Sequence, residues 1–144
     1  MYSFVKKLLT FASFIRLNPI IEMMVRKYEF PHGIMECYQN YLVFHLSSNG
    51  ISAQAAKEIL EFASRHYGNR KYVFISNRSF ASPIDPDAYK AIDTNYMVGL
   101  AIVSESEAVK QEAYNEQSLY DGSFCYFKTV AEAVNWAETV IKRI

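Results

Sequence analysis

A short polar stretch carries hydroxyl, guanidinium and carboxylate groups that could bind an anion or accept a phosphate. These residues are Ser76, Arg78, Ser79, Ser82 and Asp85. A phosphoryl group carries about −1.5 to −2 charges, and backbone N–H groups at a helix start would hold it together with a guanidinium. The planar, five-donor fork of Arg78 suits other anions in the same way. The stretch is therefore a candidate phosphorylation switch or anion site.

A structural explanation of the same stretch stays open. Serine hydroxyls commonly bond the backbone of turns. Arg78 could also form a surface ion pair with Asp85 or Asp87, which follow it closely in the sequence. In that case the stretch only connects a strand to a helix.

Acidic residues dominate the segment from 104 to 120, where Lys110 is the only basic residue. Glu105, Glu112 and Glu116 form a candidate surface for a protein partner with a basic groove. Glu112 and Glu116 lie one helical turn apart and repel each other weakly, which favours a function for this face. The alternative is an ordinary solvated helix face.

Aromatic side chains are frequent, since 11 tyrosines, 10 phenylalanines and one tryptophan make up 15% of the chain. Five tyrosines fall in the second half: Tyr89, Tyr96, Tyr114, Tyr120 and Tyr126. They could line a pocket for a small apolar or lipid-like ligand, because aromatic rings combine a large apolar area with a polar tip. The alternative is packing in the core and at its boundary.

The sequence contains no catalytic or metal-binding pattern. His32, His45 and His66 are too scattered for a recognisable metal-ligand spacing, and Cys37 and Cys125 stand alone. Glycine-rich phosphate loops, GxSxG elbows and HExxH helices do not occur. We therefore expect no enzyme, no metal and no cofactor, and the single cysteines favour a reducing, cytoplasmic setting.

Length and charge predict one soluble domain. The 144 residues, 51% of them hydrophobic, suffice for one core but not for two domains. Fifteen basic and fifteen acidic residues balance, so no overall charge would attract nucleic acid or an anionic membrane surface. We place the domain at residues 24–144.

Residues 1–23 are treated as an N-terminal extension. Their apolar run is too short for a membrane span, and no small-residue cleavage site of a signal peptide follows it. The extension is either a start-site artefact or a helix that packs on the domain. The residues of that helical stripe would be Phe4, Leu8, Phe11 and Ile15.

The first half of the domain predicts three strands and a helix. Alternating polarity predicts strands over 24–30, 34–38 and 41–46, which would pair as an antiparallel meander. From Ser52 the hydrophobic period changes to about 3.6 residues, which predicts a helix capped by Ser52 and ended by Gly68.

The second half predicts strands that alternate with helices. Apolar runs predict strands at 71–76, 97–103 and 123–128. Because a strand–helix–strand crossover requires parallel pairing, we expect a mixed α/β sheet in which an antiparallel meander is followed by parallel strands. Three helix starts are expected. They are Asp85 before Pro86, in a helix that runs to about Asn95, Ser104 with Glu107, and Thr129 with Glu132.

Several segments resemble the SpoIIAA-like group of bacterial STAS domains, which are similar in fold to the lipid-transfer CRAL-TRIO domains. The resemblance spans about residues 24 to 142 and implies a STAS-like fold. It contains no catalytic motif, so it implies fold more strongly than activity. The segments that carry it are YVFISNR at 72–78, DPDAYK at 85–90, GLAIVS at 99–104, Glu116, and SFCYFKTVAEAVNWAE at 123–138.

The resemblance also implies a function. In the anti-anti-sigma members, a partner kinase phosphorylates a serine at the turn after a central strand, and the phosphate breaks binding to that kinase. The family turn reads roughly Asp-Ser-Ser-Gly, whereas residues 76–79 of this chain read Ser-Asn-Arg-Ser. Ser79 or Ser82 would then stand near an altered switch position.

We therefore expect a non-enzymatic regulatory or protein-interaction module, acting through residues 76–89 and the helix after Val103, with a protein partner or a second copy of the chain. The alternative is a carrier of a small apolar ligand, as the likeness to lipid-transfer domains implies.

Overall fold

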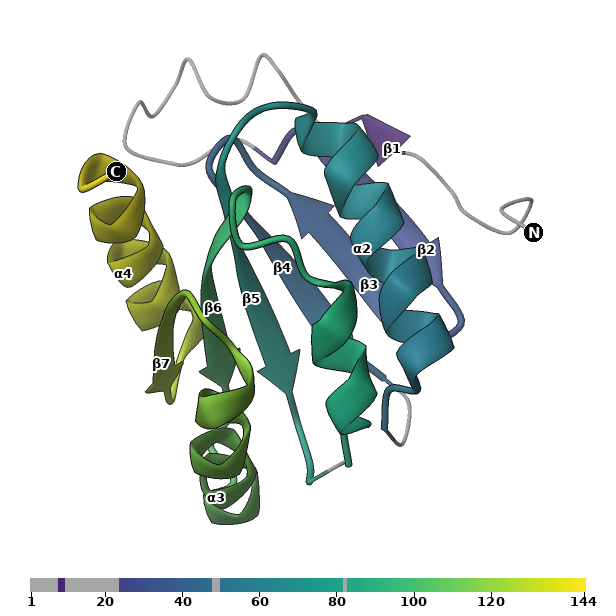
Figure 1. Ribbon diagram of the computed structural model, residues 1–144, viewed down its shortest axis with the longest axis vertical. Coiled ribbons are helices and arrows are strands. Elements are labelled where there is room, and N and C mark those ends of the chain that lie inside the picture. Colours follow the sequence, from purple (N-terminus) through teal and green to yellow (C-terminus); the bar gives the residue numbers. More distant parts are fainter. Residues whose placement is uncertain (1–7, 10–23, 48–49, 82) are drawn as a thin grey trace.

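A single mixed β-sheet runs through the molecule (Figure 1). The computed structural model describes residues 8–9, 24–47, 50–81 and 83–144. The seven strands formed by these residues lie side by side in the order of the sequence. β1 to β4 pair antiparallel and β4 to β7 pair parallel, which confirms the predicted mixed sheet. The strands are β1 (Leu8–Leu9), β2 (Arg26–Phe30), β3 (Gly33–Cys37), β4 (Tyr41–Leu46), β5 (Tyr72–Arg78), β6 (Met97–Val103) and β7 (Ser123–Phe127).

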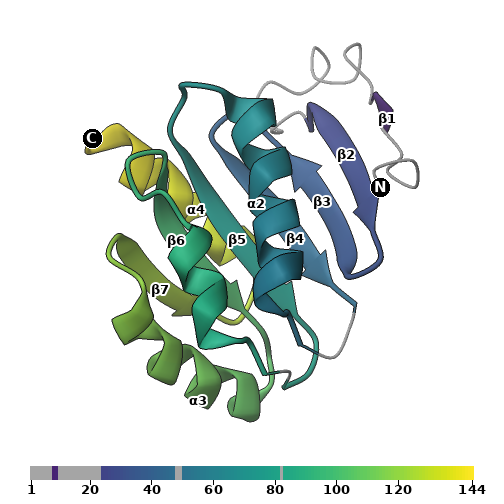
Figure 2. The same cartoon turned by 45° about the vertical axis from the view of Figure 1, so that its right-hand side comes forward.

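Helices cover both faces of this sheet. The parallel strands are joined by α2 (Ala53–Tyr67), by the 3₁₀ helix η2 (Pro86–Ala91), and by α3 (Glu107–Glu116) with the short 3₁₀ helix η3 (Gln117–Leu119). α2 and η2 lie in front of the sheet in Figure 2, and α4 (Val130–Lys142) lies behind it against β5, β6 and β7. In the described part of the chain, no helix combines the length and the apolar character needed to cross a membrane.

The alternation of side chains along the strands divides the core into two layers. On β4, Leu42 and Phe44 pack in the layer with α2, whereas Tyr41 and Val43 pack in the layer with α4. Both faces of β6 are covered in this way, which explains why its sequence, MVGLAIV, contains no polar residue. Gly99 in β6 lies where α4 contacts the sheet, because an added Cβ would lie 3.4 Å from side-chain carbons of Trp136 and Val140 on α4.

The ends of α2 agree with the prediction and have a local cause. The Ser52 hydroxyl accepts a hydrogen bond from the Ala55 N–H at 3.1 Å, which satisfies one of the free donors of the first turn. Gly68 ends the helix with φ +60°, a conformation that glycine adopts without strain. Tyr67 then anchors the last turn, since its hydroxyl lies 2.6 Å from the Tyr41 carbonyl oxygen.

The helix predicted after Asp85 is shorter and of a different type. Asp85 caps it as expected, because its carboxylate accepts a hydrogen bond from the Asp87 N–H at 2.9 Å. The segment is nevertheless a 3₁₀ helix that ends at Ala91, and the predicted extension to Asn95 was wrong. The Asp93 carboxylate accepts a hydrogen bond from the Asn95 N–H, so these residues form a turn instead of a further helical turn.

The predicted capping box at Ser104 was also wrong, whereas the one at Thr129 is confirmed. Ser106 caps α3 by accepting a hydrogen bond from the Val109 N–H. Ser104 instead accepts a hydrogen bond from the Ser106 N–H, so it shapes the turn that precedes the helix. At α4 the side chains of Thr129 and Glu132 make both hydrogen bonds of the capping box.

The first described residues add a strand at the edge of the sheet. β1 pairs antiparallel with β2. Leu8 therefore lies in a strand and not in the predicted helix. The other residues of that helical stripe, Phe4, Phe11 and Ile15, lie outside the described residues.

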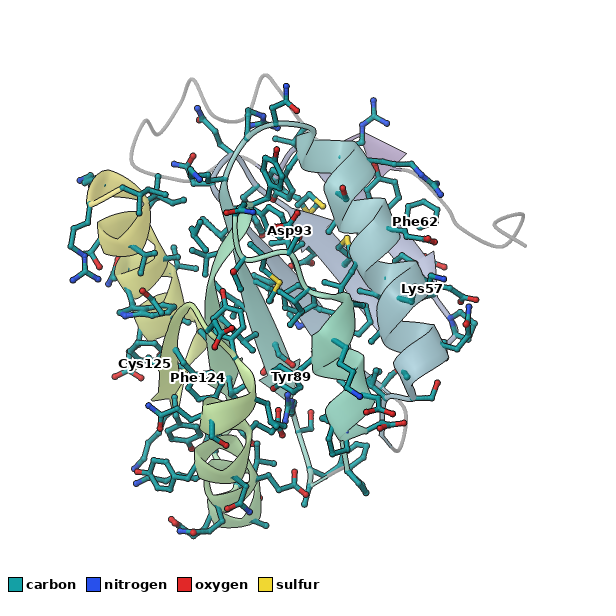
Figure 3. All side chains as sticks on the ribbon, viewed as in Figure 1. Lys57, Phe62, Tyr89, Asp93, Phe124 and Cys125 are labelled. Carbon is teal, nitrogen blue, oxygen red and sulfur yellow. The ribbon has the colours of Figure 1, made fainter. Side chains whose placement is uncertain are left out.

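The two cysteines differ in burial, which gives a chemical test of the fold. Cys37 on β3 is fully buried, and burial raises the pKa of its thiol to about 12. Cys125 lies half-buried on the edge strand β7 (Figure 3).

At about pH 8, we expect a disulfide-exchange reagent to label Cys125 in the folded protein and Cys37 only after unfolding. Mass spectrometry of the peptides measures both rates. Equal labelling of the two thiols would contradict the burial of β3, and Cys125→Ser should remove the fast reaction.

Candidate functional site

A buried ion pair joins the end of β5 to α3. Arg78 Nη1 lies 2.8 Å from Glu116 Oε2, and Arg78 Nη2 lies 2.9 Å from Glu116 Oε1. Only 4% of Arg78 and 7% of Glu116 is exposed. Because the pair is bidentate, each side chain holds the other in one orientation and offsets part of the cost of burying a charge.

Two hydroxyl groups complete this polar cluster. Arg78 Nε donates a hydrogen bond to Ser76 Oγ at 3.1 Å, from the same face of β5. The Tyr89 hydroxyl, which comes from η2, donates to Glu116 Oε1. We call these four residues, Ser76, Arg78, Tyr89 and Glu116, the Arg78 cluster. It connects β5, η2 and α3, which are far apart in the sequence.

The surroundings hold two groups of the cluster in one protonation state. Burial alone would lower the pKa of Arg78, but the hydrogen bonds and the charge of Glu116 outweigh it and raise this pKa. Burial, followed by the negative charge of Glu116, raises the pKa of Tyr89. Arg78 therefore stays cationic and Tyr89 keeps its proton near neutral pH. Fixed protonation suits a binding surface better than proton transfer, which needs a pKa close to the working pH.

The Arg78 cluster forms the polar end of an apolar cavity. The cavity lies between the sheet, α2 and η2 and has a volume of about 80 Å³. Fifteen of the described residues line it. Twelve of these are apolar, and the other three are Ser76, Arg78 and Tyr89. Figure 3 labels Tyr89, which reaches from η2 toward α3. Apolar walls with a few convergent polar groups are typical of small-molecule sites.

A contact between two loops forms part of the cavity wall beside η2. Ile51 and Ile84, which both line the cavity, form an isolated parallel bridge. The Ile51 N–H donates to the Pro83 carbonyl at 3.2 Å, and the loop before α2 is thereby tied to the loop before η2. Gly50 permits this approach, because its φ is +90° and an added Cβ would lie 2.6 Å from the Pro83 oxygen.

The structure brings together only part of the predicted switch or anion site. Ser76 and Arg78 are buried in the Arg78 cluster, whereas Ser79 and Asp85 are exposed. Ser82 lies outside the described residues. Arg78 pairs with an acidic residue of α3 and not with Asp85, which caps η2. A role of Ser79 as a phosphorylation switch stays a prediction.

The acidic residues near α3 do not share one surface. Glu105 is exposed, Glu112 is half-buried, and Glu116 is buried against the guanidinium of β5. The prediction that Glu116 belongs to an exposed acidic face was therefore wrong. A signal was available in the sequence, because Val109, Ala113 and Glu116 follow the helical spacing i, i+4 and i+7 of one buried stripe.

The five tyrosines of the second half have three different environments. Tyr89 lines the cavity, whereas Tyr96 and Tyr114 are 40% and 54% exposed. Tyr120 and Tyr126 donate hydrogen bonds to backbone carbonyls at the two ends of β6. The prediction of a pocket thus applies to Tyr89, and the alternative of packing applies to Tyr120 and Tyr126.

A second polar cluster lies on the sheet face that packs against α4, across β3, β4 and β5. His45 Nε2 lies 3.0 Å from Glu36 Oε1, and His45 Nδ1 lies 3.0 Å from Asn77 Nδ2. Because an amide nitrogen only donates, Nδ1 accepts in this geometry and Nε2 carries the proton. Both ring nitrogens are engaged, so the arrangement offers no free nitrogen for general-base catalysis.

Among the described residues, no group of three His, Cys, Asp or Glu side chains could hold a metal ion.

Comparison with known proteins adds evidence on the fold. No protein-family model and no curated protein matches the sequence. The chain is similar to an uncharacterised protein of the DUF3478 family from Shewanella loihica PV-4, whose crystal structure is described as having a SpoIIAA-like fold. The match covers 77% of this chain and 90% of that one, with a TM-score of 0.50 and 13% identity. The chain has a SpoIIAA-like fold.

This result confirms the resemblance that the sequence indicated. At 13% identity the similarity establishes the SpoIIAA-like fold alone, and function must be argued from the site.

The first site prediction concerns the charge of Glu116. Glu116→Gln would leave the Arg78 charge buried without its counter-ion, so we expect the free energy of unfolding to fall by about 3 kcal/mol. The double variant Arg78→Met/Glu116→Met replaces the pair with apolar chains and should recover most of this loss. Urea denaturation measures both changes.

Glu105→Gln is the matched control for this experiment, since Glu105 is exposed. It should change the free energy of unfolding by less than about 0.5 kcal/mol. Equal losses for the two glutamate variants would contradict the role of the buried pair.

The second site prediction concerns the dependence of stability on pH. The hydrogen bond from His45 lowers the pKa of Glu36 below its ordinary value of 4.5 in the folded state, although partial burial opposes this shift. The resulting stabilisation is present above pH 4.5 and is lost as the pH falls through the lowered pKa. The difference in unfolding free energy between the native protein and Glu36→Gln should therefore shrink on acidification. Glu29→Gln, on the neighbouring strand, is the control, and a difference that grows in acid would refute the assignment.

Proposed function

We propose that this protein is a non-enzymatic binding module that holds a small apolar ligand in the cavity beneath η2. The observation that carries the proposal is the cavity itself. Among the described residues, twelve apolar and three polar side chains line it, and the polar ones belong to the hydrogen-bonded Arg78 cluster. A cavity of this composition in the core gives no packing benefit when it is empty, because its walls lose dispersion contacts. A ligand that fills it recovers them.

The short helix η2 would control access to this cavity. Only Ala88 of its six residues is buried, and a 3₁₀ helix of this length has few hydrogen bonds of its own. Elements with few buried contacts open at low free-energy cost, although opening of η2 would also require release of the Tyr89 hydroxyl from Glu116. The cavity has a volume of about 80 Å³, which is smaller than the roughly 150 Å³ of a cavity that admits a benzene ring. A ligand of that size or larger would therefore enter with an outward movement of η2.

A second candidate function is recognition of a protein partner or of a second copy of the chain. Large apolar side chains are exposed around the carboxyl ends of β5 and α3: Phe80 is 41%, Tyr114 is 54% and Leu119 is 42% exposed. Exposed apolar groups of this kind often mark interaction sites. A phosphate on the exposed Ser79 would lie beside this surface and could regulate binding. The resemblance to anti-anti-sigma domains, in which a serine at this turn is phosphorylated, implies such a role.

We propose a reducing, cytoplasmic setting for either function, because both cysteines are free.

Two measurements test this second candidate. Sedimentation equilibrium should detect a dimer that weakens at least tenfold in Phe80→Ser/Tyr114→Ser, because both side chains would lose a buried contact. Intact mass of protein isolated from its own host, before and after phosphatase treatment, would reveal a phosphate on Ser79. A monomeric, unphosphorylated chain would count against both ideas.

The cavity makes a direct prediction about ligand binding. Ala88 lines the cavity from η2, so Ala88→Leu should fill part of it and weaken the binding of a small hydrocarbon such as methylenecyclopentane by about tenfold. Ala91→Leu makes the same change at an exposed position of the same helix and should leave binding unchanged. Methyl NMR titration, read at Ile59 and Ile84 of the cavity wall, measures the dissociation constant. No shift at these methyls at saturating hydrocarbon would refute the proposal.

A further inference from the structure

The hydrogen-bonding capacity of the Arg78 cluster restricts which ligand the cavity can accept. The inference below rests on the proposed function and concerns the chemical class of the ligand. Ser76 Oγ accepts a hydrogen bond from Arg78 Nε, so the hydroxyl proton of Ser76 remains to be donated. Within the described residues, no side chain or carbonyl accepts it. Ser76 is 8% exposed and lines the cavity, so this donor is directed to the cavity or stays unsatisfied.

Most of the remaining polar groups of the cluster are already engaged. Two terminal N–H groups of Arg78 are donated to Glu116, and its Nε–H is donated to Ser76. The Tyr89 proton is donated to Glu116. Since a guanidinium has five N–H donors, two of Arg78 remain beside the Ser76 hydroxyl. The polar end of the cavity therefore presents free O–H and N–H donors.

The charge of the cluster is already balanced. The Arg78 guanidinium meets the Glu116 carboxylate in a bidentate pair, and both side chains are almost fully buried. A ligand carboxylate would add a second negative charge beside Glu116 and would lose its hydration without gaining an unpaired cation. A charged ligand amine would lose its hydration beside the Arg78 guanidinium without gaining an unpaired carboxylate. Neither kind of charged group is complementary to this end of the cavity.

We propose that the cavity binds a neutral, mostly apolar molecule with one hydrogen-bond acceptor, such as a ketone, ester or lactone carbonyl, which accepts the Ser76 hydroxyl proton. The apolar part contacts the side chains of β4, α2 and η2, and the carbonyl oxygen lies beside Ser76 and Arg78. Recognition of this kind discriminates strongly, because a ligand without the acceptor leaves a buried donor unpaired.

A matched set of three small probes tests this inference on the full chain. Cyclopentanone has the acceptor, methylenecyclopentane has the same shape without it, and cyclopentanecarboxylate replaces it with a charge. We expect cyclopentanone to bind about tenfold more tightly than methylenecyclopentane, and the carboxylate to bind most weakly. NMR titration read at the methyls of Ile59 and Ile84 gives the three dissociation constants.

Substitution of Ser76 tests the donor itself. Ser76→Ala should reduce the affinity for cyclopentanone about tenfold and leave that for methylenecyclopentane within about twofold. Ser76→Thr keeps the hydroxyl and should keep the preference for the ketone. A hydrogen bond from Ser76 should lower the carbonyl stretching frequency of bound cyclopentanone in the native protein relative to Ser76→Ala. A purely structural role of Ser76 would not produce this difference in frequency.

The outcomes separate this inference from the proposed function. If none of the three probes shifts the cavity methyls, the proposed function fails and the inference with it. If methylenecyclopentane binds as tightly as cyclopentanone, or the carboxylate binds most tightly, the cavity binds ligands but the inference is overturned. If Ser76→Ala folds poorly, the comparison of the three probes on the native protein still decides between these outcomes.

Discussion

The bidentate contact between Arg78 and Glu116 determines how the second half of the molecule is assembled. It fixes α3 to the end of β5, and through the Tyr89 hydroxyl it also fixes η2 to both. A buried pair of this kind contributes less to stability than its Coulomb energy suggests, because two charges have lost their hydration. Its main effect is orientation, since a misplaced partner would leave a charge buried alone. The pair therefore selects one arrangement of three elements that share few other polar contacts.

The same contact explains why a cavity exists in an otherwise well-packed layer. Between β4 and β5 the crossover is the fifteen-residue helix α2, whose buried face fills the space above the sheet. Between β5 and β6 the crossover is η2, with six residues and one buried side chain. A short helix held at one side by Tyr89 covers less of the sheet than a full α-helix would. The unfilled volume lies under η2, next to the polar groups that hold it.

The sequence was informative wherever local signals determined the structure. The Ser52 cap, the Gly68 stop and the apolar run of β6 depend on neighbouring residues, and each was predicted at its observed position. The SpoIIAA-like fold could be predicted because the order of these elements is itself a strong constraint. Capping at Ser104 was predicted wrongly because Ser106 competes for the same helix two residues later.

The site was less predictable because it depends on contacts between distant residues. Arg78 and Glu116 are 38 positions apart, and nothing local distinguishes Glu116 from the exposed Glu105 except its place on the buried stripe of α3. The sequence predicted a pocket at Tyr89 but not its place under η2, because the Asp85 cap is compatible with both a 3₁₀ helix and a longer α-helix. Tertiary contacts, and not local preference, decide such cases.

The position of α4 has a consequence for how the chain is made. In the described structure α4 is the helix that packs on the layer formed by Val43, Ile75 and Val103, and it is built from residues 130 to 142, after all seven strands. A nascent chain could therefore assemble its sheet strand by strand, each new strand pairing with the previous one, yet still expose one apolar face to the ribosome's surroundings. Such intermediates aggregate or recruit chaperones. This apolar face is therefore covered only when α4 docks on it, after β7 has been made.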